Sequence, residues 1–260
     1  MVSLMPEHNF LFVVEGDADE PRFIKQLFQK CYSSVPFKTY TYRTNLHNLA
    51  KVIEEEYPDF ESDEIDIKLV LKSKEENSDK RKILEAKYTD IFLIFDFEPQ
   101  QDVPRFPVIR RMLTYFNDST NHGKLFINYP MMQSYKHFTK LPEPEFESLK
   151  VTIDECKSYK RIVGAVSKYT DVTQYTYPHF MSIAVHHLRK ANLIMNGTYI
   201  TPEKDEYLQW NYVHIFDKQI EEKDLNKTVF VLNTCIFVLV DYRPSSFFMQ
   251  LTDRKQQFMV

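Results

Sequence analysis

Apolar and polar residues alternate along the first half of the chain in blocks that predict strands and helices in turn. Residues 10–14 form an apolar run typical of a buried strand, and residues 21–31 place apolar side chains at helical spacing. The same patterns predict strands over 37–43, 65–71, 90–95 and 124–128, and helices over 46–57 and 106–116. Strands that alternate with helices in this way indicate the α/β class, with a mostly parallel sheet flanked by helices.

The pattern changes after Pro130. Residues 141–147 are rich in proline and glutamate and predict a connecting loop, and 149–195 is predicted to be largely helical. The apolar run 229–242 is shorter than the roughly 20 residues that a membrane-spanning helix needs, so we expect it to be buried core. We therefore expect an α/β portion over 1–140 and a mainly helical portion over 141–260.

Carboxylates follow two of the predicted buried strands. Glu15 comes directly after the first strand and before Gly16, and Asp96 and Glu98 follow the strand over 90–95. Ligands of parallel sheets bind beyond the carboxyl ends of the strands, so these three carboxylates are expected to lie together. Clustered carboxylates repel one another unless a cation neutralises them, and hard oxygen ligands suit Mg²⁺ or Mn²⁺.

Composition narrows the classes of function. The chain has only 4 glycines and contains neither the G-x-G-x-x-G fingerprint nor a P-loop, which argues against a Rossmann dehydrogenase or an NTPase. The net charge of −4 is unusual for a general nucleic-acid coating protein but compatible with a nuclease that carries a carboxylate site. Three widely spaced cysteines and an N-terminus without a signal-peptide pattern indicate a cytoplasmic protein with reduced thiols and no membrane segment.

The two acidic strand ends resemble the Toprim fold of topoisomerases, primases and OLD-type nucleases. Its motif is an apolar strand ending in Glu-Gly, matched here by Glu15-Gly16, and a second strand ending in Asp-x-Asp, matched by Asp96-Phe97-Glu98. Asp19 falls where OLD-like nucleases place a second acidic residue. The segment from Asn128 through Pro130 to Gln133 is similar to the Asn-Pro-x-x-Glu segment of RloB-like proteins, which include effectors of PARIS-type abortive-infection systems.

This resemblance implies a Toprim nuclease with Glu15, Asp96 and Glu98 as catalytic residues and with Asp19 joining them as ligands of Mg²⁺ or Mn²⁺. It also implies a toxic role in phage defence, a DNA or tRNA/RNA substrate, and a separate ABC-type ATPase as partner, and it leaves a homodimer open. Two positions depart from the family pattern. Glu98 replaces an aspartate and is one methylene longer, and Gln133 replaces a glutamate, so it cannot act as a base.

Further residues are candidates for supporting roles. Asp17 or Asp19 is expected to cap the first helix. The adjacent histidines His186 and His187 are expected to serve packing, with only one of them facing inward. Basic residues near the acidic strand end or on helix faces are candidate phosphate contacts; they are Arg110, Arg111, Lys136, His137, Lys160 and Arg161.

The sequence leaves three functions open. The leading hypothesis is a metal-dependent nuclease. The alternative is a non-catalytic Toprim-like interaction module, which the amide at Gln133 favours. A third possibility is a phosphatase or nucleotidyl enzyme that acts on small phosphates and would need a closed pocket.

Overall fold

The computed structural model describes residues 8–59, 64–101 and 103–253. Contacts divide the chain into two units, the first made of Met1–Phe95 and Val103–Phe126 and the second of Asp96–Asp102 and Ile127–Val260. The loop predicted over 141–147 lies inside the second unit. The N-terminal segment 1–7, which entered the expectation about a signal peptide, lies outside the described residues.

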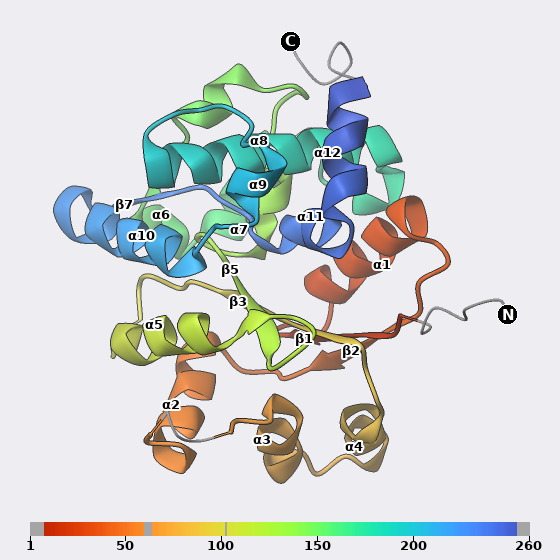
Figure 1. The fold of residues 1–260 in the computed structure, drawn as a ribbon. Helices are drawn as coiled ribbons and strands as arrows, with labels where there is room; N and C mark the ends of the chain where they lie inside the picture. Colours follow the sequence, from red (N-terminus) through yellow and green to blue (C-terminus); the bar gives the residue numbers. More distant parts are fainter. Residues whose placement is uncertain (1–7, 60–63, 102, 254–260) are drawn as a thin grey trace, which may run out of the picture. The chain divides into compact units, whose positions relative to one another are not determined.

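A five-stranded sheet in the order β2-β1-β3-β5-β4 organises the first unit (Figure 1). Its strands are β1 (Phe10–Val14), β2 (Phe37–Thr41), β3 (Asp90–Asp96), β4 (Asn117–Asp118) and β5 (Gly123–Asn128). Strand β1 pairs in parallel with both β2 and β3, whereas β4 pairs antiparallel with β5. The predicted α/β class, with a mostly parallel sheet flanked by helices, is therefore confirmed.

Stacked phenylalanines form the core on one face of this sheet. Phe12 of β1 lies beside Phe92 of β3 in the parallel register, with ring centroids 5.3 Å apart and nearly parallel planes. Phe28 of helix α1 (Asp19–Cys31) packs edge-on against both Phe10 and Phe12. Because residues two apart on a strand share a face, the alternation of β1 turns Phe10 and Phe12 together toward α1.

Four further helices complete the first unit: α2 (Leu46–Glu56), α3 (Ile67–Lys74), α4 (Ser78–Glu85) and α5 (Phe106–Tyr115). Helix α2 lies on the opposite face of the sheet from α1 (Figure 1). The strand predicted over 65–71 is wrong, because most of this segment forms α3. The Asp66 side chain accepts a hydrogen bond from the Lys68 amide at 2.8 Å and caps the helix, whose buried residues recur at helical spacing.

The second unit is mostly helical and contains a two-stranded antiparallel sheet of β6 (Lys150–Thr152) and β7 (Thr228–Phe230). Its helices are α6 (Ile153–Cys156), α7 (Tyr159–Val166), α8 (Tyr177–Asn196), α9 (Lys204–Tyr207), α10 (Tyr212–Asn226), α11 (Val238–Tyr242) and α12 (Pro244–Asp253). Short 3-10 turns connect them: η1 (Met132–Lys136), η2 (Pro144–Glu147), η3 (Val172–Gln174) and η4 (Cys235–Phe237).

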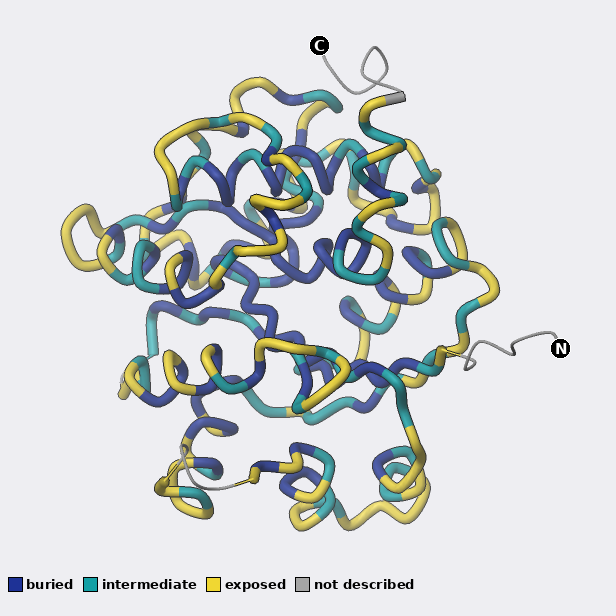
Figure 2. Tube along the Cα trace, in the orientation of Figure 1, coloured by how far each residue is buried: buried dark blue, intermediate teal, exposed yellow. Residues whose placement is uncertain are grey.

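Helix α8 is largely buried, as the dark segments of its trace in Figure 2 show. It ends at Gly197, whose φ of 76° is the left-handed conformation that favours glycine at a helix end. Both His186 and His187 are buried, at 3% and 0% exposure. The expectation that only one of them faces inward is wrong, because α8 is covered on more than one side.

The apolar run 229–242 also lies in the interior, as predicted: Val231, Leu232 and the residues 235–240 are buried. No helix in the described ranges combines the length and the apolar content needed to cross a membrane. The three cysteines are free thiols, and burial raises the pKa of Cys31 and of Cys156 to about 12.

Candidate carboxylate site

Backbone hydrogen bonds fix Glu15 at the carboxyl end of β1. The strand itself is fully buried, and Glu15 is the half-buried residue that follows it. Pairing with the neighbouring β2 chain continues past both strands, because the Tyr42 amide donates to the Val14 carbonyl at 2.9 Å and the Arg43 amide donates to the Glu15 carbonyl at 3.1 Å. The backbone that carries the Glu15 carboxylate is therefore held on the β2 side.

A second carboxylate lies close to the Glu15-Gly16 turn. Glu20, at the start of α1, is buried at 7% exposure. A Cβ atom placed on Gly16 would come within 2.7 Å of Glu20 Oε2, so glycine at this position lets the Glu20 carboxylate approach the backbone. Asp19 is half-buried at the first position of α1, where the helix dipole stabilises negative charge.

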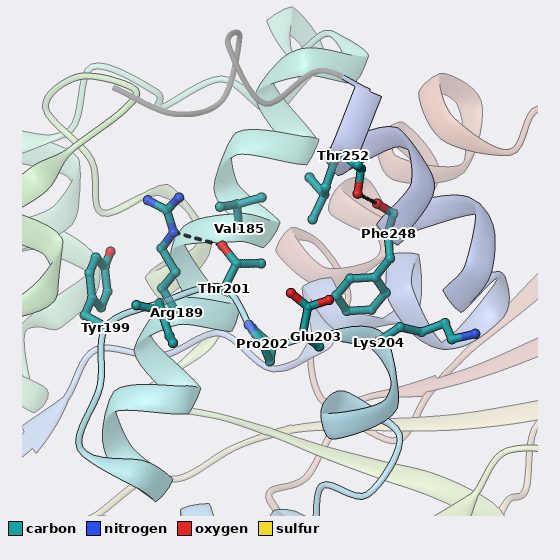
Figure 3. Close-up of a pocket in the computed structure, with 11 residues that line it drawn as sticks. Val185, Arg189, Tyr199, Thr201, Pro202, Glu203, Lys204, Phe248 and Thr252 are labelled. Atoms are coloured by element: carbon teal, nitrogen blue, oxygen red, sulfur yellow. Dashed lines mark hydrogen bonds between the residues drawn. The ribbon is translucent and has the colours of Figure 1, made fainter.

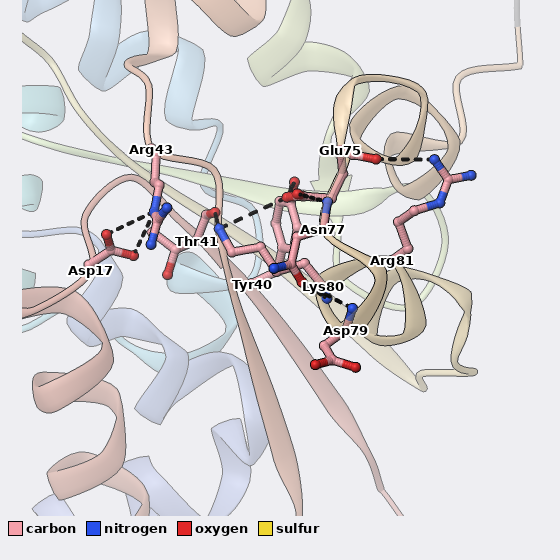
Figure 4. Close-up of polar contacts among 9 residues, drawn as sticks. All are labelled: Asp17, Tyr40, Thr41, Arg43, Glu75, Asn77, Asp79, Lys80 and Arg81. Atoms are coloured by element: carbon pink, nitrogen blue, oxygen red, sulfur yellow. Dashed lines mark hydrogen bonds and ion pairs between the residues drawn. The ribbon is translucent and has the colours of Figure 1, made fainter.

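Asp17 does not cap α1. The residue at the N-cap position is Ala18, and no side chain makes a capping hydrogen bond there. The expectation of a cap by Asp17 or Asp19 is wrong: Asp17 pairs instead with Arg43, Oδ2 to Nε at 2.9 Å (Figure 4), and Asp19 lies within the helix. Arg43 has a left-handed φ of 63°, which directs the chain out of β2.

Arg43 is a basic residue that sequence reasoning missed. Its amide contacts the Glu15 backbone, whereas its guanidinium is 64% exposed beside Asp17. A further ion-pair cluster follows β2: the Lys80 ammonium donates to the Thr41 carbonyl at 2.9 Å and lies 3.9 Å from Glu75. Burial alone raises the pKa of Glu75, but hydrogen bonds from the Asn77 amide and the Tyr40 hydroxyl, with the Lys80 charge, lower it overall.

Asp96 is the last residue of β3, and the segment after β5 holds its side chain. Asp96 Oδ1 accepts a hydrogen bond from the Met132 amide at 2.7 Å. The following backbone is fixed by the same segment, because the Phe97 amide donates to the Asn128 carbonyl at 3.0 Å and the Glu98 amide donates to the Pro130 carbonyl at 3.4 Å. The segment 128–132 therefore positions the Asp-x-Glu sequence.

Glu98 has a strained backbone. Its φ of 45° lies in the left-handed region, which residues other than glycine seldom adopt. The Gln101 side chain donates to Glu98 Oε2 at 2.6 Å and holds the carboxylate. Strain of this kind persists only where surrounding structure enforces it, and it is concentrated at functional sites.

Asn233 supports the segment that holds Asp96. Its side-chain amide donates to the Met132 carbonyl at 3.0 Å and to Ser134 Oγ at 3.3 Å, and its Oδ1 accepts from the Ile236 amide at 3.1 Å. Asn233 is fully buried, and Gln133, which follows Met132 in the chain, is 5% exposed. Asn233, 101 positions after Met132, thus fixes the Met132 carbonyl, while the Met132 amide binds Asp96.

The predicted ligands follow two adjacent strands. In the parallel pairing of β1 with β3, Val14 is opposite Ile94; Glu15 comes one residue after Val14, and Asp96 comes two residues after Ile94. Carboxylate oxygens have the hard-donor character that Mg²⁺ or Mn²⁺ requires. The side chains of the described residues form no group of three or more acidic, histidine or cysteine residues arranged to hold a metal ion.

The candidate phosphate contacts near η1 have local partners. Lys136 Nζ lies 5.6 Å from the centre of the Tyr135 ring. His137 Nδ1 is 2.9 Å from the Tyr159 hydroxyl, and burial lowers the pKa of His137 below its usual 6.5. His137 is therefore neutral at pH 7, suited to donating or accepting a hydrogen bond and not to attracting a phosphate by charge.

The other candidate phosphate contacts are exposed on helices. Arg110 and Arg111 lie on α5, and the Arg111 guanidinium donates to the Pro58 carbonyl at 3.2 Å. Lys160 and Arg161 lie on the exposed face of α7. All four residues are exposed, as is common both for basic helix faces and for residues that contact a nucleic-acid backbone.

The structure thus shows three features at the predicted residues: a fixed backbone at Glu15, an oriented carboxylate at Asp96 and a strained backbone at Glu98. Glu20, Arg43 and Asn233 are the residues that sequence reasoning missed. The E-G-x-x-x-E spacing could have indicated Glu20, whereas nothing local in the sequence indicates Asn233. Comparison of this chain with family models, with curated proteins and with solved structures gives no match.

Proposed function

We propose that this chain is a metal-dependent nuclease of the Toprim type, with Glu15, Asp96 and Glu98 as its catalytic carboxylates. The observation that carries the proposal is the parallel pairing of β1 with β3, since the carboxyl ends of parallel neighbours share one edge of the sheet. Glu15 follows one of these strands and Asp96 ends the other. The Toprim resemblance, with one apolar strand that ends in Glu-Gly and another that ends in Asp-x-Glu, supports the same proposal.

The proposed chemistry assigns a role to each group. Glu15, Asp96 and Glu98, with Asp19 beside them, would hold Mg²⁺ or Mn²⁺. When bound, such an ion polarises a phosphoryl oxygen and favours attack by water. The Met132 amide keeps Asp96 oriented, with one carboxylate oxygen engaged at 2.7 Å. Arg43 and the basic residues Arg110, Arg111, Lys136, Lys160 and Arg161 would contact phosphates of the substrate.

The substrate and the partner follow from the same resemblance. The proposed substrate is DNA or tRNA, and the proposed setting is phage defence in the cytoplasm. The chain contains no P-loop sequence, so ATP-dependent control would come from a separate ABC-type ATPase.

The experiment measures cleavage of labelled DNA and of total tRNA with Mg²⁺ or Mn²⁺. We expect Glu15→Gln and Asp96→Asn each to reduce the cleavage rate at least a hundredfold, since each removes a charged metal ligand. Asp205→Asn is the matched control, because that carboxylate is 91% exposed and belongs to α9. Thermal melting of all variants should stay within a few degrees of the unmodified protein.

A second measurement separates catalysis from assembly. Mn²⁺ binding, followed by electron paramagnetic resonance, should occur in the unmodified protein and in Asp205→Asn and be lost in Asp96→Asn. Cleavage that persists in both carboxylate variants would refute the proposal. A protein that neither binds Mn²⁺ nor cleaves either substrate would be the non-catalytic interaction module instead.

A further inference from the structure

A pocket of about 680 Å³ opens in the second unit, among α8, the segment 199–204 and α12 (Figure 3). Its volume is within the range of about 300–1,000 Å³ that is typical of small-molecule sites. None of its lining residues is among the proposed nuclease residues, so what it binds is a separate question from the carboxylate site.

Arg189 is the polar centre of this pocket. It lies on α8 and is half-buried, and its Nε donates to Thr201 Oγ1 at 3.0 Å. This bond holds the guanidinium plane at one edge and leaves the two terminal nitrogens directed away from Thr201 (Figure 3). Within the described residues, Arg189 forms no ion pair. A guanidinium fixed in this manner is prepared to bind a carboxylate or a phosphate through two parallel hydrogen bonds.

The groups beside Arg189 do not neutralise its charge. Tyr199 lines the same pocket, and its hydroxyl is 2.9 Å from His186 Nδ1. Burial raises the pKa of Tyr199, so its hydroxyl stays neutral. Burial, together with the positive charge of Arg189, lowers the pKa of His186 to about 4, so this ring is neutral as well. The carboxylate of Glu203, which also lines the pocket, is exposed to solvent.

Apolar side chains supply the rest of the pocket wall. Val185 of α8 is buried, Phe248 and Leu251 come from α12, and Ile200 exposes 60% of its surface. Burying such surface against a ligand removes it from water and favours binding. The pocket therefore combines apolar walls with a guanidinium that, among the described residues, forms no ion pair, and an occupant should combine an anionic group with an apolar body.

We propose that this pocket binds a small organic anion, a carboxylate or phosphate joined to an aromatic or aliphatic body. The anionic group lies against the Arg189 guanidinium, and the apolar body packs between Val185 and Phe248. Lys204 also lines the pocket, but its ammonium lies 3.7 Å from the Asp205 carboxylate, so Arg189 remains the cation that the ligand would meet.

The experiment titrates the intact protein with 1-naphthyl phosphate and 1-naphthoate by isothermal calorimetry, in buffer containing EDTA. The chelator removes divalent ions, so the carboxylate site cannot recruit the phosphate through a metal. We expect both probes to bind, and we expect inorganic phosphate and neutral 1-naphthol to bind at least tenfold more weakly. Each of these two comparison compounds lacks one half of the proposed ligand.

Variants locate the binding. Arg189→Gln should weaken the binding of 1-naphthyl phosphate at least tenfold. The affinity of Arg189→Lys should lie between those of the unmodified protein and Arg189→Gln, because lysine keeps the charge but loses the two parallel N–H donors. Phe248→Ala should also weaken binding. Arg243→Gln, which changes an exposed arginine outside the pocket, should leave affinity within twofold, and thermal melting checks that each variant is folded. The proposal is overturned if Arg189→Gln binds 1-naphthyl phosphate as tightly as the unmodified protein does. It is also overturned if 1-naphthol binds as tightly as 1-naphthyl phosphate, or if neither anionic probe binds.

Discussion

Among the described residues of the first unit, the buried polar or charged side chains are Glu20, His47 and Asp90, whereas the second unit buries a much larger set around α8 and Asn233. The difference follows from the backbone. Strands β1, β2 and β3 satisfy one another's amides and carbonyls, so side chains facing the core need only be apolar. The second unit contains 3-10 turns and short connections, and side chains must supply the missing hydrogen bonds.

Gln219 illustrates how a side chain replaces a strand in the second unit. Its amide group donates to the Phe230 carbonyl and accepts from the Phe230 amide, both at 3.0 Å. This is the pair of bonds that a neighbouring strand residue would make. Lys190 has a similar function, because its ammonium donates to the carbonyls of Phe146, Glu147 and Leu149. Apolar contacts therefore dominate the first unit, whereas the second unit combines its apolar core with buried side chains that bond to the backbone.

The largest expected effect concerns the apolar first unit. Phe12→Ala should lower the free energy of unfolding by about 4 kcal/mol, because it removes a fully buried ring that contacts Phe28, Phe37 and Phe92. Urea unfolding followed by circular dichroism measures the change. Leu225→Ala, at a side chain that is 73% exposed, is the control and should cost little. A loss below about 1 kcal/mol for Phe12→Ala would contradict the dominance of apolar contacts in this unit.

The second prediction concerns the hydrogen-bonded second unit. Asn233→Leu keeps a side chain of similar size but leaves the Met132 carbonyl and the Ile236 amide without their side-chain partner. We expect Asn233→Leu to lower the free energy of unfolding, measured with urea, by about 3 kcal/mol. Asn211→Ala, which removes the exposed cap of α10, should cost about 1 kcal/mol. If the two variants lose equal stability, burial of polar side chains does not distinguish the units.

A pH dependence should arise from Lys190. Burial lowers the pKa of this ammonium from 10.5 to about 7, with the charge of Lys150 adding to the effect. Between pH 7 and 10 the unfolded chain then holds a proton that the folded chain releases, so stability contributed by this group rises with pH. The three carbonyl acceptors oppose this shift by favouring the charged form, so the rise should be partial.

The measurement compares the unmodified protein with Lys190→Met by urea unfolding at pH 7 and pH 9. We expect the free energy of unfolding of the unmodified protein to rise by about 1–2 kcal/mol relative to that of the variant between pH 7 and pH 9. Groups that titrate in both proteins cancel in the difference. If the two proteins differ in free energy of unfolding by the same amount at pH 7 and at pH 9, Lys190 keeps its proton over this interval, held by the three carbonyls.

The smallest expected effect concerns the Arg43–Asp17 pair. Both side chains are more than half exposed, at 64% and 56%. Arg43→Gln should therefore change the free energy of unfolding by less than ~0.5 kcal/mol, because solvent screens the pair. Asp17→Asn should change the free energy of unfolding by a similar amount. In 0.5 M NaCl, both variants should be as stable as the unmodified protein. A cost above about 1.5 kcal/mol would show that this surface pair stabilises the first unit as strongly as a buried group.

Much of the first unit follows from the sequence pattern. Residues 10–14 and 90–95 are apolar runs, and 46–57 places apolar residues at helical spacing, so their elements could be predicted. The helix that covers most of residues 65–71 could not be predicted, because the spacing of Ile65, Ile67 and Leu69 fits the two-residue period of a strand as well as a helix. The cap at Asp66 decides for the helix, and Leu69 is 58% exposed.

The candidate site could be predicted only in part. Glu15 and Asp96 follow apolar strands, so their position at the strand ends is visible in the sequence. The left-handed backbone of Glu98 and the Met132 amide at Asp96 are not visible, because they depend on chain segments brought together by folding. The polar interior of α8 was missed for the same reason: a histidine or lysine in an apolar helix gives no sign of which carbonyls it will meet.

The bond from Asn233 to the Met132 carbonyl spans 101 residues of the chain. At a synthesis rate of ~5–20 residues per second, a ribosome needs about 5–20 s to add that stretch. Until then, Met132 lacks the partner that fixes the backbone presented to Asp96. A nascent or truncated chain that stops before Asn233 therefore carries both acidic strands with the Asp96 support incomplete. Under the proposed nuclease function, this dependence would delay activity until Asn233 has been synthesised.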